Sequence, residues 1–571
     1  MPASPTAAAW PCCWAGCRTT APAGTTRRAA RVRSRHRAGH ARRRWPSPAA
    51  PARRRSVRPG DEHDAGTRLG RTGMSPSRRA FLMALGGGLV ASPGRQLVVA
   101  GDRAAAQRDA APVRTVELEV REATWEIAPG RTIKAMTYNG RVPGPEIRAR
   151  EGERLRVVLR NALAEPTTVH WHGVDVPNAM DGVPDITQKP VAPGESFIYE
   201  FDARPAGTRW YHTHFREHRQ MDLGLAAPLI IDAAGPEPMT YDREITLVLD
   251  DWATGSGPAL PPTPEGTAVG RRGMGGMMGG GMMGGRGMGG MMGGGMMHGR
   301  AMHEPAYDTM TINGKAYPAT EPLLLRKGER VRLRIVNASA EHTHVVRLAG
   351  HRLHVTHTDG NPLVAPVAVD AIPVAPSERY DAVVVAERPG AWFFHCTQPG
   401  HAAAGERMVV AYAGHEARRP AEPDLDVSGV VVWHHALGRG QDVLPDAAGQ
   451  TRTFDLTLSG GMMGSEIWTI NGKVYPRTDP LPVKRGDRAV IRLRNMSPEA
   501  HPMHLHGQSF RVLALNGARH ARPLVKDTVD VPAHMGSAVI EFTAHNVGDW
   551  FFHCHKPMHM DGGMIAVVTI G

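Results

Sequence analysis

The sequence has few cysteines and no long hydrophobic run. Five of its 571 residues are cysteines, and three of these lie within the first 17 positions. The two that remain, Cys396 and Cys554, cannot form a disulfide framework, although one bridge between them is conceivable. No segment approaches the roughly 20 consecutive apolar residues of a membrane-spanning helix. We therefore expect no stable membrane anchor once any export signal has been removed.

An excess of charge is also missing from most of the chain, although the formal net charge is +13. Residues 1–73 hold 16 arginines and three acidic residues, whereas the other 498 residues hold 52 basic and 52 acidic side chains. This neutral body gives no electrostatic reason to expect a nucleic-acid partner. Residues 1–73 also lack aliphatic periodicity, so we expect a disordered leader that is not part of the native protein.

A second possible N-terminus follows at Met74. The string Ser-Arg-Arg-Ala-Phe-Leu at Ser77–Leu82 resembles a twin-arginine export signal, and a modest apolar run follows it. The alternative is a chance pair of arginines in an arginine-rich region. We predict that residues 74–106 are an export signal and that the folded protein works in the periplasm or elsewhere outside the cytoplasm.

The rest of the chain contains one pattern three times. Each copy begins with a Thr-x-Asn-Gly string and continues through a charge-flanked glycine to an alternating segment that ends at Asn161, Asn337 or Asn495. Alternation of polar and apolar residues is typical of strands with one solvated face. The sequence therefore predicts an all-β protein of three β-sandwich domains. These domains are expected at residues 113–237, 242–415 and 428–571.

Histidines recur in pairs separated by one residue. The pairs are His170 and His172, His212 and His214, His504 and His506, and His553 and His555. Residues i and i+2 of a strand face the same side, so each pair presents two imidazoles to one point. A single pair would more often be a surface or core feature. Four pairs in two repeats supply eight imidazoles, which is enough for a cluster of three copper ions.

The last pair flanks Cys554, and further ligand types surround it. His501 precedes the pair, and His559 and Met564 follow it. A thiolate, two imidazoles and a distant thioether suit a copper ion that exchanges one electron with little rearrangement. The segment from His553 to Met564 thus predicts an electron-transfer site joined directly to the cluster.

These motifs resemble the four copper motifs of the multicopper oxidases, over residues 113–571. The stretch from His170 to Asp250, with the Met-Gly repeats, is most similar to bacterial copper-resistance oxidases of the CopA kind. The resemblance implies cupredoxin-like Greek-key domains, four copper ions and dioxygen as the electron acceptor. It implies type 2 copper at His170 and His504, a type 3 pair at His172, His212, His214, His506, His553 and His555, and type 1 copper at His501, Cys554, His559 and Met564.

Asp181 lies nine residues after His172, in the string Met-Asp-Gly-Val-Pro. It resembles the acid that the family places beside the cluster, and we predict that it relays protons to oxygen. The alternative is a turn residue before Gly182.

The middle domain departs from the family pattern, because it repeats the string Trp-Phe-Phe-His-Cys at Trp392–Cys396. His401 follows Cys396 as His559 follows Cys554, which predicts a second type 1 copper and a fifth copper ion in all. The alternative is an inherited site that is now empty. The candidate ligands are His344 (with His342 as a rival), Cys396, His401 and Met408, the last lying 12 rather than ten residues after the cysteine.

A methionine-rich insert is expected within the second domain, at residues 271–303. Eleven of the 28 methionines lie between positions 274 and 302, separated by glycines that cannot hold a packed structure. Thioethers are soft ligands that select Cu(I), so we favour Cu(I) capture over an incidental linker. The candidate ligands are Met274, Met277, Met278, Met282, Met283, Met288, Met291, Met292, Met296 and Met297.

These observations favour an oxidase that takes electrons from Cu(I), reduces dioxygen to water and serves copper tolerance. A laccase-like oxidase of phenols or amines, with a small aromatic reductant as the donor, is the first alternative. A non-catalytic copper-binding protein is the second, but storage does not require four paired-histidine strands.

Overall fold

A computed structural model describes residues 113–255, 257, 260, 306–461 and 465–571. The predicted leader (1–73), the predicted signal (74–106) and the methionine-rich insert (271–303) lie outside these residues. None of the helices within the described ranges is long and apolar enough to cross a membrane.

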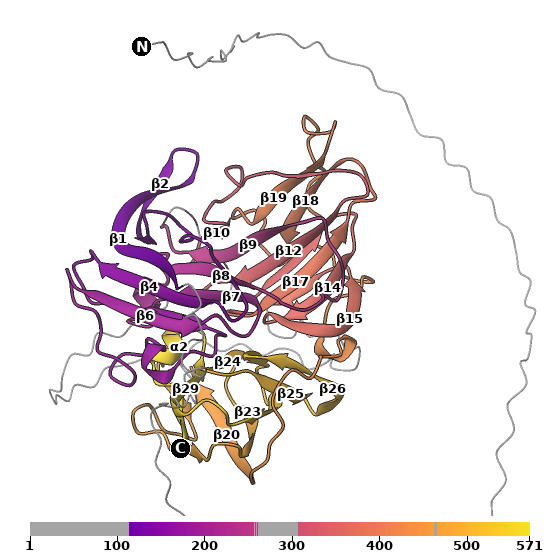
Figure 1. Ribbon diagram of the computed structural model, residues 1–571. Helices are drawn as coiled ribbons and strands as arrows, with labels where there is room; N and C mark the ends of the chain where they lie inside the picture. The colour runs from indigo at the N-terminus through magenta and orange to yellow at the C-terminus, as the bar shows by residue number, and fades with distance from the viewer. Residues whose placement is uncertain (1–112, 256, 258–259, 261–305, 462–464) are drawn as a thin grey trace, which may run out of the picture. The chain divides into compact units, whose positions relative to one another are not determined.

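The described chain is built from strands in six sheets, two for each of three successive domains (Figure 1). In the first domain the sheets have the orders β2-β1-β4-β6 and β3-β8-β7-β5. The strands are β1 (Arg114–Ala128), β2 (Arg131–Tyr138), β3 (Ile147–Arg150), β4 (Arg154–Asn161), β5 (His170–His172), β6 (Ser196–Asp202), β7 (Gly207–His212) and β8 (Ala226–Asp232).

The second domain contains a six-stranded sheet, β10-β9-β12-β17-β14-β15, and a five-stranded sheet, β11-β19-β18-β13-β16. Its strands are β9 (Arg243–Trp252), β10 (Thr309–Ile312), β11 (Leu323–Leu325), β12 (Arg330–Asn337), β13 (His344–Leu348), β14 (Leu353–Thr358), β15 (Asn361–Val369), β16 (Ile372–Val374), β17 (Arg379–Val385), β18 (Ala391–Cys396) and β19 (Arg407–Tyr412).

The third domain repeats this arrangement strand for strand, with the sheets β21-β20-β23-β28-β25-β26 and β22-β30-β29-β24-β27. Its strands are β20 (Thr451–Gly460), β21 (Trp468–Ile470), β22 (Leu481–Val483), β23 (Arg488–Asn495), β24 (His501–Leu505), β25 (Phe510–Leu515), β26 (Ala518–Lys526), β27 (Thr528–Val531), β28 (Ser537–Thr543), β29 (Gly548–Cys554) and β30 (Ile565–Ile570). The described helices are short: α1 (Glu217–Gln220), α2 (Pro557–Asp561) and the 3-10 turns η1 (Asn178–Met180) and η2 (His435–Leu437).

The repeated Asn-Gly string forms a tight turn in each domain. Asn139, Asn313 and Asn471 have φ between 52° and 53°, and the glycine after each also has positive φ. Two successive positive φ angles match the right-handed twist of a hairpin, and asparagine and glycine adopt them at least cost. The repeat found in the sequence is therefore the two-residue turn that follows the second strand of each domain, namely β2, β10 and β21.

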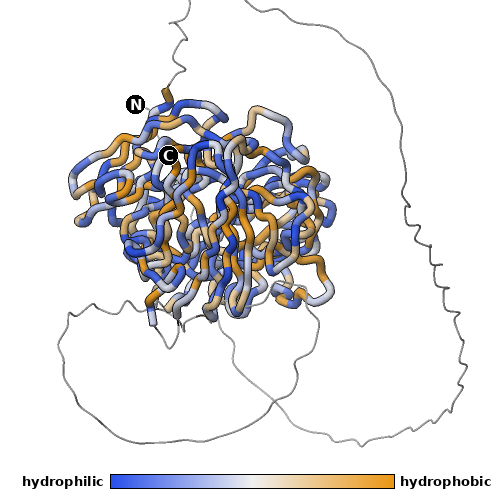
Figure 2. Tube along the Cα trace, turned by 90° about the horizontal axis from the view of Figure 1, so that it is seen from below, coloured by the Kyte–Doolittle hydropathy of each residue, from blue (hydrophilic) through white to orange (hydrophobic). Residues whose placement is uncertain are grey.

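Hydrophobic and hydrophilic residues alternate along the chain (Figure 2). In β23, Ala489, Ile491 and Leu493 are buried, whereas Arg488, Arg492 and Arg494 are exposed. The first and third domains share one continuous apolar core, and the middle domain has a separate core. The shared core contains residues of β5, β7, β24 and β29, the strands that contain or directly precede the paired histidines.

Candidate metal centres

The eight paired histidines converge between the first and third domains. Pairing of β5 with β7 sets His170 opposite His212, and pairing of β24 with β29 sets His504 opposite His553. All eight side chains are buried, with at most 3% of any residue exposed. The two domains meet through stacked rings. The ring centroids of His170 and His506 lie 3.8 Å apart, and those of His172 and His504 lie 3.6 Å apart.

His170 and His504 have the same hydrogen-bonding arrangement. The Nδ1 of His170 donates to the carbonyl of Asp181 at 3.0 Å, and that of His504 donates to the carbonyl of Asp527 at 2.8 Å. In each ring Nε2 is buried without a hydrogen-bond partner. Buried polar atoms rarely stay unpaired, and metal-binding histidines commonly anchor their other nitrogen in this way. These two rings are thus prepared to bind one cation.

A second pair of rings brings lone pairs together. His506 Nε2 lies 3.0 Å from His553 Nε2. The Nδ1 of His506 bonds to Asp181 Oδ2 and that of His553 to the Cys554 carbonyl, so both Nδ1 atoms serve as donors and both Nε2 atoms are left as acceptors. Two acceptors at this distance repel unless a cation lies between them. His214 completes a group of three with this pair, and His212 Nε2 faces His555 Nε2 at 3.3 Å.

Burial keeps these imidazoles neutral. Burial lowers the pKa of His553 to about 3. Burial, reinforced by the neighbouring rings, lowers the pKa of six others well below the ordinary range: His172, His212, His214, His504, His506 and His555. Because neutral imidazole is the form that binds metals, these seven rings are in their ligating state at neutral pH.

Asp181 lies against the cluster, where the sequence predicted it. It is fully buried, and its Oδ2 lies 2.8 Å from His506 Nδ1 while its Oδ1 lies 3.2 Å from His170 Nδ1. It follows η1 and precedes Gly182, whose φ of +83° turns the chain back toward β5.

Two further carboxylates at the cluster were not found by sequence reasoning. Asp527 Oδ1 lies 3.1 Å from His172 Nε2, and both Asp527 oxygens lie 2.6 Å from the Arg379 guanidinium of the middle domain. Glu217 Oε1 lies 3.3 Å from His214 Nε2, and burial raises the pKa of Glu217 well above its ordinary value. Glu217 could have been suspected from its place three residues after His214, but nothing local marks Asp527.

The predicted electron-transfer residues also converge. His501 Nδ1 and His559 Nδ1 lie 3.0 Å apart, and Cys554 Sγ lies 3.6 Å from the first and 3.4 Å from the second. The Cys554 backbone N–H donates to the Met564 carbonyl at 3.2 Å, which holds the two residues side by side. Burial raises the pKa of the Cys554 thiol well above its usual range, so a bound cation is needed to keep it as a thiolate at neutral pH.

Side chains around this site fix its imidazoles. The Nε2 of His501 hydrogen bonds to Ser497 Oγ at 2.7 Å, and the Nε2 of His559 lies 3.2 Å from Glu499 Oε2. Trp468 covers the site, with its ring centroid 3.7 Å from that of His559. Partners of this kind set the tautomer and orientation of metal-binding histidines.

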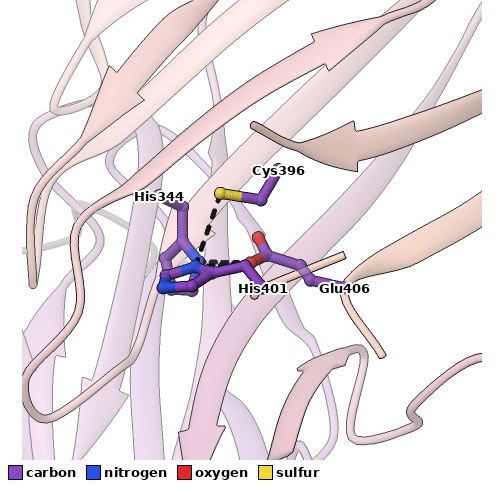
Figure 3. Close-up of side chains that lie close together, drawn as sticks. All are labelled: His344, Cys396, His401 and Glu406. Atoms are coloured by element: carbon purple, nitrogen blue, oxygen red, sulfur yellow. Dashed lines mark hydrogen bonds and ion pairs between the residues drawn. The ribbon is translucent and has the colours of Figure 1, made fainter. Parts of the chain in front are cut away.

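A comparable group lies in the middle domain, but with a different fourth member (Figure 3). His344, Cys396 and His401 come together as the sequence predicted, and the rival His342 instead bonds to Asp251 at 2.8 Å. Glu406, not Met408, occupies the position of Met564. Met408 is paired with Phe394 two residues further along β19 and packs into the apolar core. The prediction of Met408 as the axial ligand is therefore corrected, because the extra two residues move it along the strand and away from the site.

Comparison with known proteins bears directly on these centres. Three profiles described as multicopper oxidase match residues 119–235, 291–415 and 450–571. A multicopper oxidase of Mycobacterium tuberculosis is 34% identical over 461 residues, covering 76% of this chain and 83% of the relative. The chain belongs to the multicopper oxidase family.

Further relatives agree with this membership. A copper resistance protein A homolog of Pseudomonas syringae pv. tomato is 28% identical over 538 residues, covering 77% of this chain and 90% of the relative. The crystal structure of a multi-copper oxidase from Pseudomonas thermotolerans aligns with a TM-score of 0.60 at 26% identity, covering 81% of this chain and all of that one. The predicted three-domain, cupredoxin-like all-β fold is confirmed. This multicopper oxidase is an oxidoreductase, and copper is the metal that its family implies.

Proposed function

We propose that this multicopper oxidase couples the one-electron oxidation of Cu(I) to the four-electron reduction of dioxygen to water, in copper tolerance. The observation that carries the proposal is Cys554, whose sulfur belongs to the His501–His559 site while its two chain neighbours belong to the histidine cluster. Copper ions, when bound, would supply one-electron steps at the first site and oxygen reduction at the second.

The metal-binding side chains divide between three kinds of copper site. The unpaired Nε2 atoms of His170 and His504 support a type 2 ion, and the two sets of facing Nε2 atoms support a type 3 pair. Proposed type 3 ligands are His172, His212, His214, His506, His553 and His555. Proposed type 1 ligands are His501, Cys554, His559 and Met564, which makes four copper ions in all.

The chain itself supplies a covalent path between the two sites and a candidate relay for protons. The backbone from Cys554 to His553 and His555 is a short covalent path between the two sites. Asp181 lies beside two cluster imidazoles, and its Oδ1 has no hydrogen-bond partner, so it can hold a proton at Oδ1 next to the cluster. Reduction of dioxygen to water consumes protons, and we propose Asp181 as their relay.

Cu(I) is favoured as the donor for two reasons. The methionine-rich segment offers soft thioether ligands of the kind that select Cu(I). One relative is named as a copper resistance protein homolog. We further propose, from the twin-arginine string Ser77–Leu82, that the protein acts outside the cytoplasm; a native peptide from before Met74 would argue against the proposed start and signal.

Removal of residues 274–302 tests the donor. The deletion is expected to lower Cu(I) oxidation selectively and to leave phenol oxidation near that of the intact protein. A matched control keeps the segment's length and glycines but replaces its methionines with serine, and it should reproduce the loss if thioethers are responsible.

Equal rates with Cu(I) after the deletion would contradict the proposed donor and favour a laccase-like oxidase. Oxygen uptake by the copper-loaded protein separates either oxidase from a copper store. No uptake with any donor would contradict the enzymatic proposal.

A further inference from the structure

The middle domain brings together four side chains that the oxidase function does not use: His344, Cys396, His401 and Glu406 (Figure 3). All four are essentially buried. Glu406 Oε2 lies 2.7 Å from His344 Nδ1 and 3.3 Å from His401 Nδ1, and Cys396 Sγ lies 3.4 Å from His401 Nδ1. One nitrogen, sulfur or oxygen from each residue thus points at a common centre.

This group reproduces the supporting structure of the type 1 site. Cys396 pairs with the residue two positions after His344, as Cys554 pairs with the residue two positions after His501. Ser339 Oγ bonds to His344 Nε2 at 2.7 Å, the same distance that separates Ser497 Oγ from His501 Nε2. A hydrogen bond of this kind directs Nδ1 toward a metal, so the middle domain keeps the orienting partner as well as the ligands.

One ligand has been replaced. Glu406 and Met564 each lie ten residues after their cysteine. The backbone carbonyl of each accepts a hydrogen bond from the backbone N–H of that cysteine, at 3.3 Å for Glu406 and 3.2 Å for Met564. A carboxylate that contacts both imidazoles therefore stands where the type 1 site has a thioether. Its second oxygen, Oε1, is buried without a hydrogen-bond partner, which also suits a metal ligand.

The replacement changes which ion the site prefers. A thiolate and a carboxylate carry two negative charges, and the two imidazoles are neutral ligands. A divalent ion balances these charges, whereas Cu(I) would leave one uncompensated charge in the buried interior. A carboxylate is also a harder ligand than a thioether and favours the divalent state.

The route to the cluster is missing as well. Thr397 follows Cys396 where His555 follows Cys554, and its hydroxyl donates to the Val345 carbonyl. On the opposite strand, Arg347 is paired with His395 where the third domain pairs His504 with His553. The cysteine of the middle domain therefore has no cluster ligand as its next neighbour.

We propose that His344, Cys396, His401 and Glu406 form a fifth metal site that binds a divalent ion, Cu²⁺ or Zn²⁺, and keeps it divalent without relaying electrons. This site would be closed, with four protein ligands and no blue-copper character. It is additional to the proposed oxidase function and does not depend on it.

The test compares metal content and spectra of the purified full-length protein and its variants, loaded with Cu²⁺ or, in a second arm, with Zn²⁺. Cys396→Ser is expected to lower the bound metal by one ion per chain while leaving the blue absorption of the Cys554 site unchanged. In the copper arm, reductant should bleach the blue absorption before it removes the electron paramagnetic resonance signal of the fifth ion.

Glu406→Met is the sharper variant, because it recreates the ligand set of the third domain. We expect it to add a second blue absorption, roughly doubling the band, through the same Cys396 sulfur. Met408→Leu is the matched control, two residues away on the same segment, and should change neither metal content nor spectrum.

Several results would overturn the proposal. One is equal metal content, in both arms, for the intact protein, Cys396→Ser and Glu406→Met. A loss of about half the blue absorption in Cys396→Ser would make the site an ordinary blue copper. Loss of the ion in Met408→Leu but not in Glu406→Gln would show that Met408, and not Glu406, is the fourth ligand. If Cys396→Ser fails to fold, the Glu406 variants decide instead: an unchanged blue absorption in Glu406→Met together with an unchanged metal content in Glu406→Gln would overturn the proposal.

Discussion

Asp181 has two proposed tasks that a single substitution can separate. Its carboxylate accepts from His506 and lies beside His170, so it orients two cluster rings as well as offering a place for a proton. Asparagine keeps an oxygen that can accept from His506 but cannot be protonated at neutral pH. We expect Asp181→Asn to lower oxygen reduction about a hundredfold or more, within the range for lost general acid catalysis.

The blue absorption reports whether this variant remains intact elsewhere. It should be retained in Asp181→Asn, because no ligand of the Cys554 site is altered, and oxygen uptake should fall in the same sample. Asp185→Asn is the control, since Asp185 lies exposed on the same loop. Unchanged oxygen uptake in Asp181→Asn would remove the relay role.

Among single residues, the sequence predicted which side chains would come together better than it predicted their hydrogen-bond partners. The paired histidines and Cys554 could be identified because strand periodicity fixes which side chains share a face. Glu406 was missed because methionine was expected from the type 1 pattern, although the ten-residue offset from cysteine already pointed to position 406. Asp527 lies 355 positions from His172 and carries no local signal, so only the folded chain shows their contact.

Among the elements, the loop after η1 depends on Gly182. A Cβ atom at this position would lie 1.9 Å from the Val169 carbonyl oxygen, next to the start of β5. Gly182→Ala is therefore expected to push the loop and Asp181 away from the cluster, lowering both stability and oxygen reduction. Thermal melting and oxygen uptake of the copper-loaded variant would measure the two effects.

Gly194 provides the matched control for this substitution. Its φ of +81° is nearly that of Gly182, but no atom lies within 4 Å of a Cβ built there. Gly194→Ala should cost only the backbone preference, about 1–2 kcal/mol, and leave oxygen reduction unchanged. Equal losses in the two variants would show that contact with Val169 is not what constrains the loop.

The elements themselves were largely predictable, because their signals are local. Two-residue alternation predicted strands such as β4 and β12, whereas the Asn-Gly strings were recognised only as the start of each repeat and not as turns. Which strands would meet across domains was not predictable. The stacking of His170 on His506 depends on the apolar core that the first and third domains share, and the sequence pattern of either domain alone does not encode that contact.

For the whole molecule, the buried histidines predict loss of stability in mild acid. Burial lowers the pKa of His553 to about 3 and that of His559 to about 4, so both stay neutral in the folded protein well below pH 6. The unfolded chain takes up these protons near the ordinary value of 6.5. Because the unfolded state then binds more protons, the free energy of unfolding falls as pH drops.

The metal-free protein should therefore lose stability between pH 6.5 and 5, by up to about 1.4 kcal/mol per pH unit for each such histidine. Four buried acids with raised pKa values, Glu217, Asp222, Asp250 and Glu378, act in the opposite direction, as do His342 and His545, whose pKa values are also raised, but these groups are outnumbered. Urea unfolding midpoints across this window would measure the net effect. Midpoints that are constant or rise toward pH 5 would contradict the prediction.

The division of the cluster between distant parts of the chain also sets an order of events during biosynthesis. Four imidazoles belong to residues 170–214 and four to residues 504–555. A nascent chain on the ribosome exposes the first four long before the last four exist, and the intervening middle domain must be made in between. The complete eight-imidazole chamber can therefore close only when synthesis has passed residue 555, so folding comes first and full metal loading last.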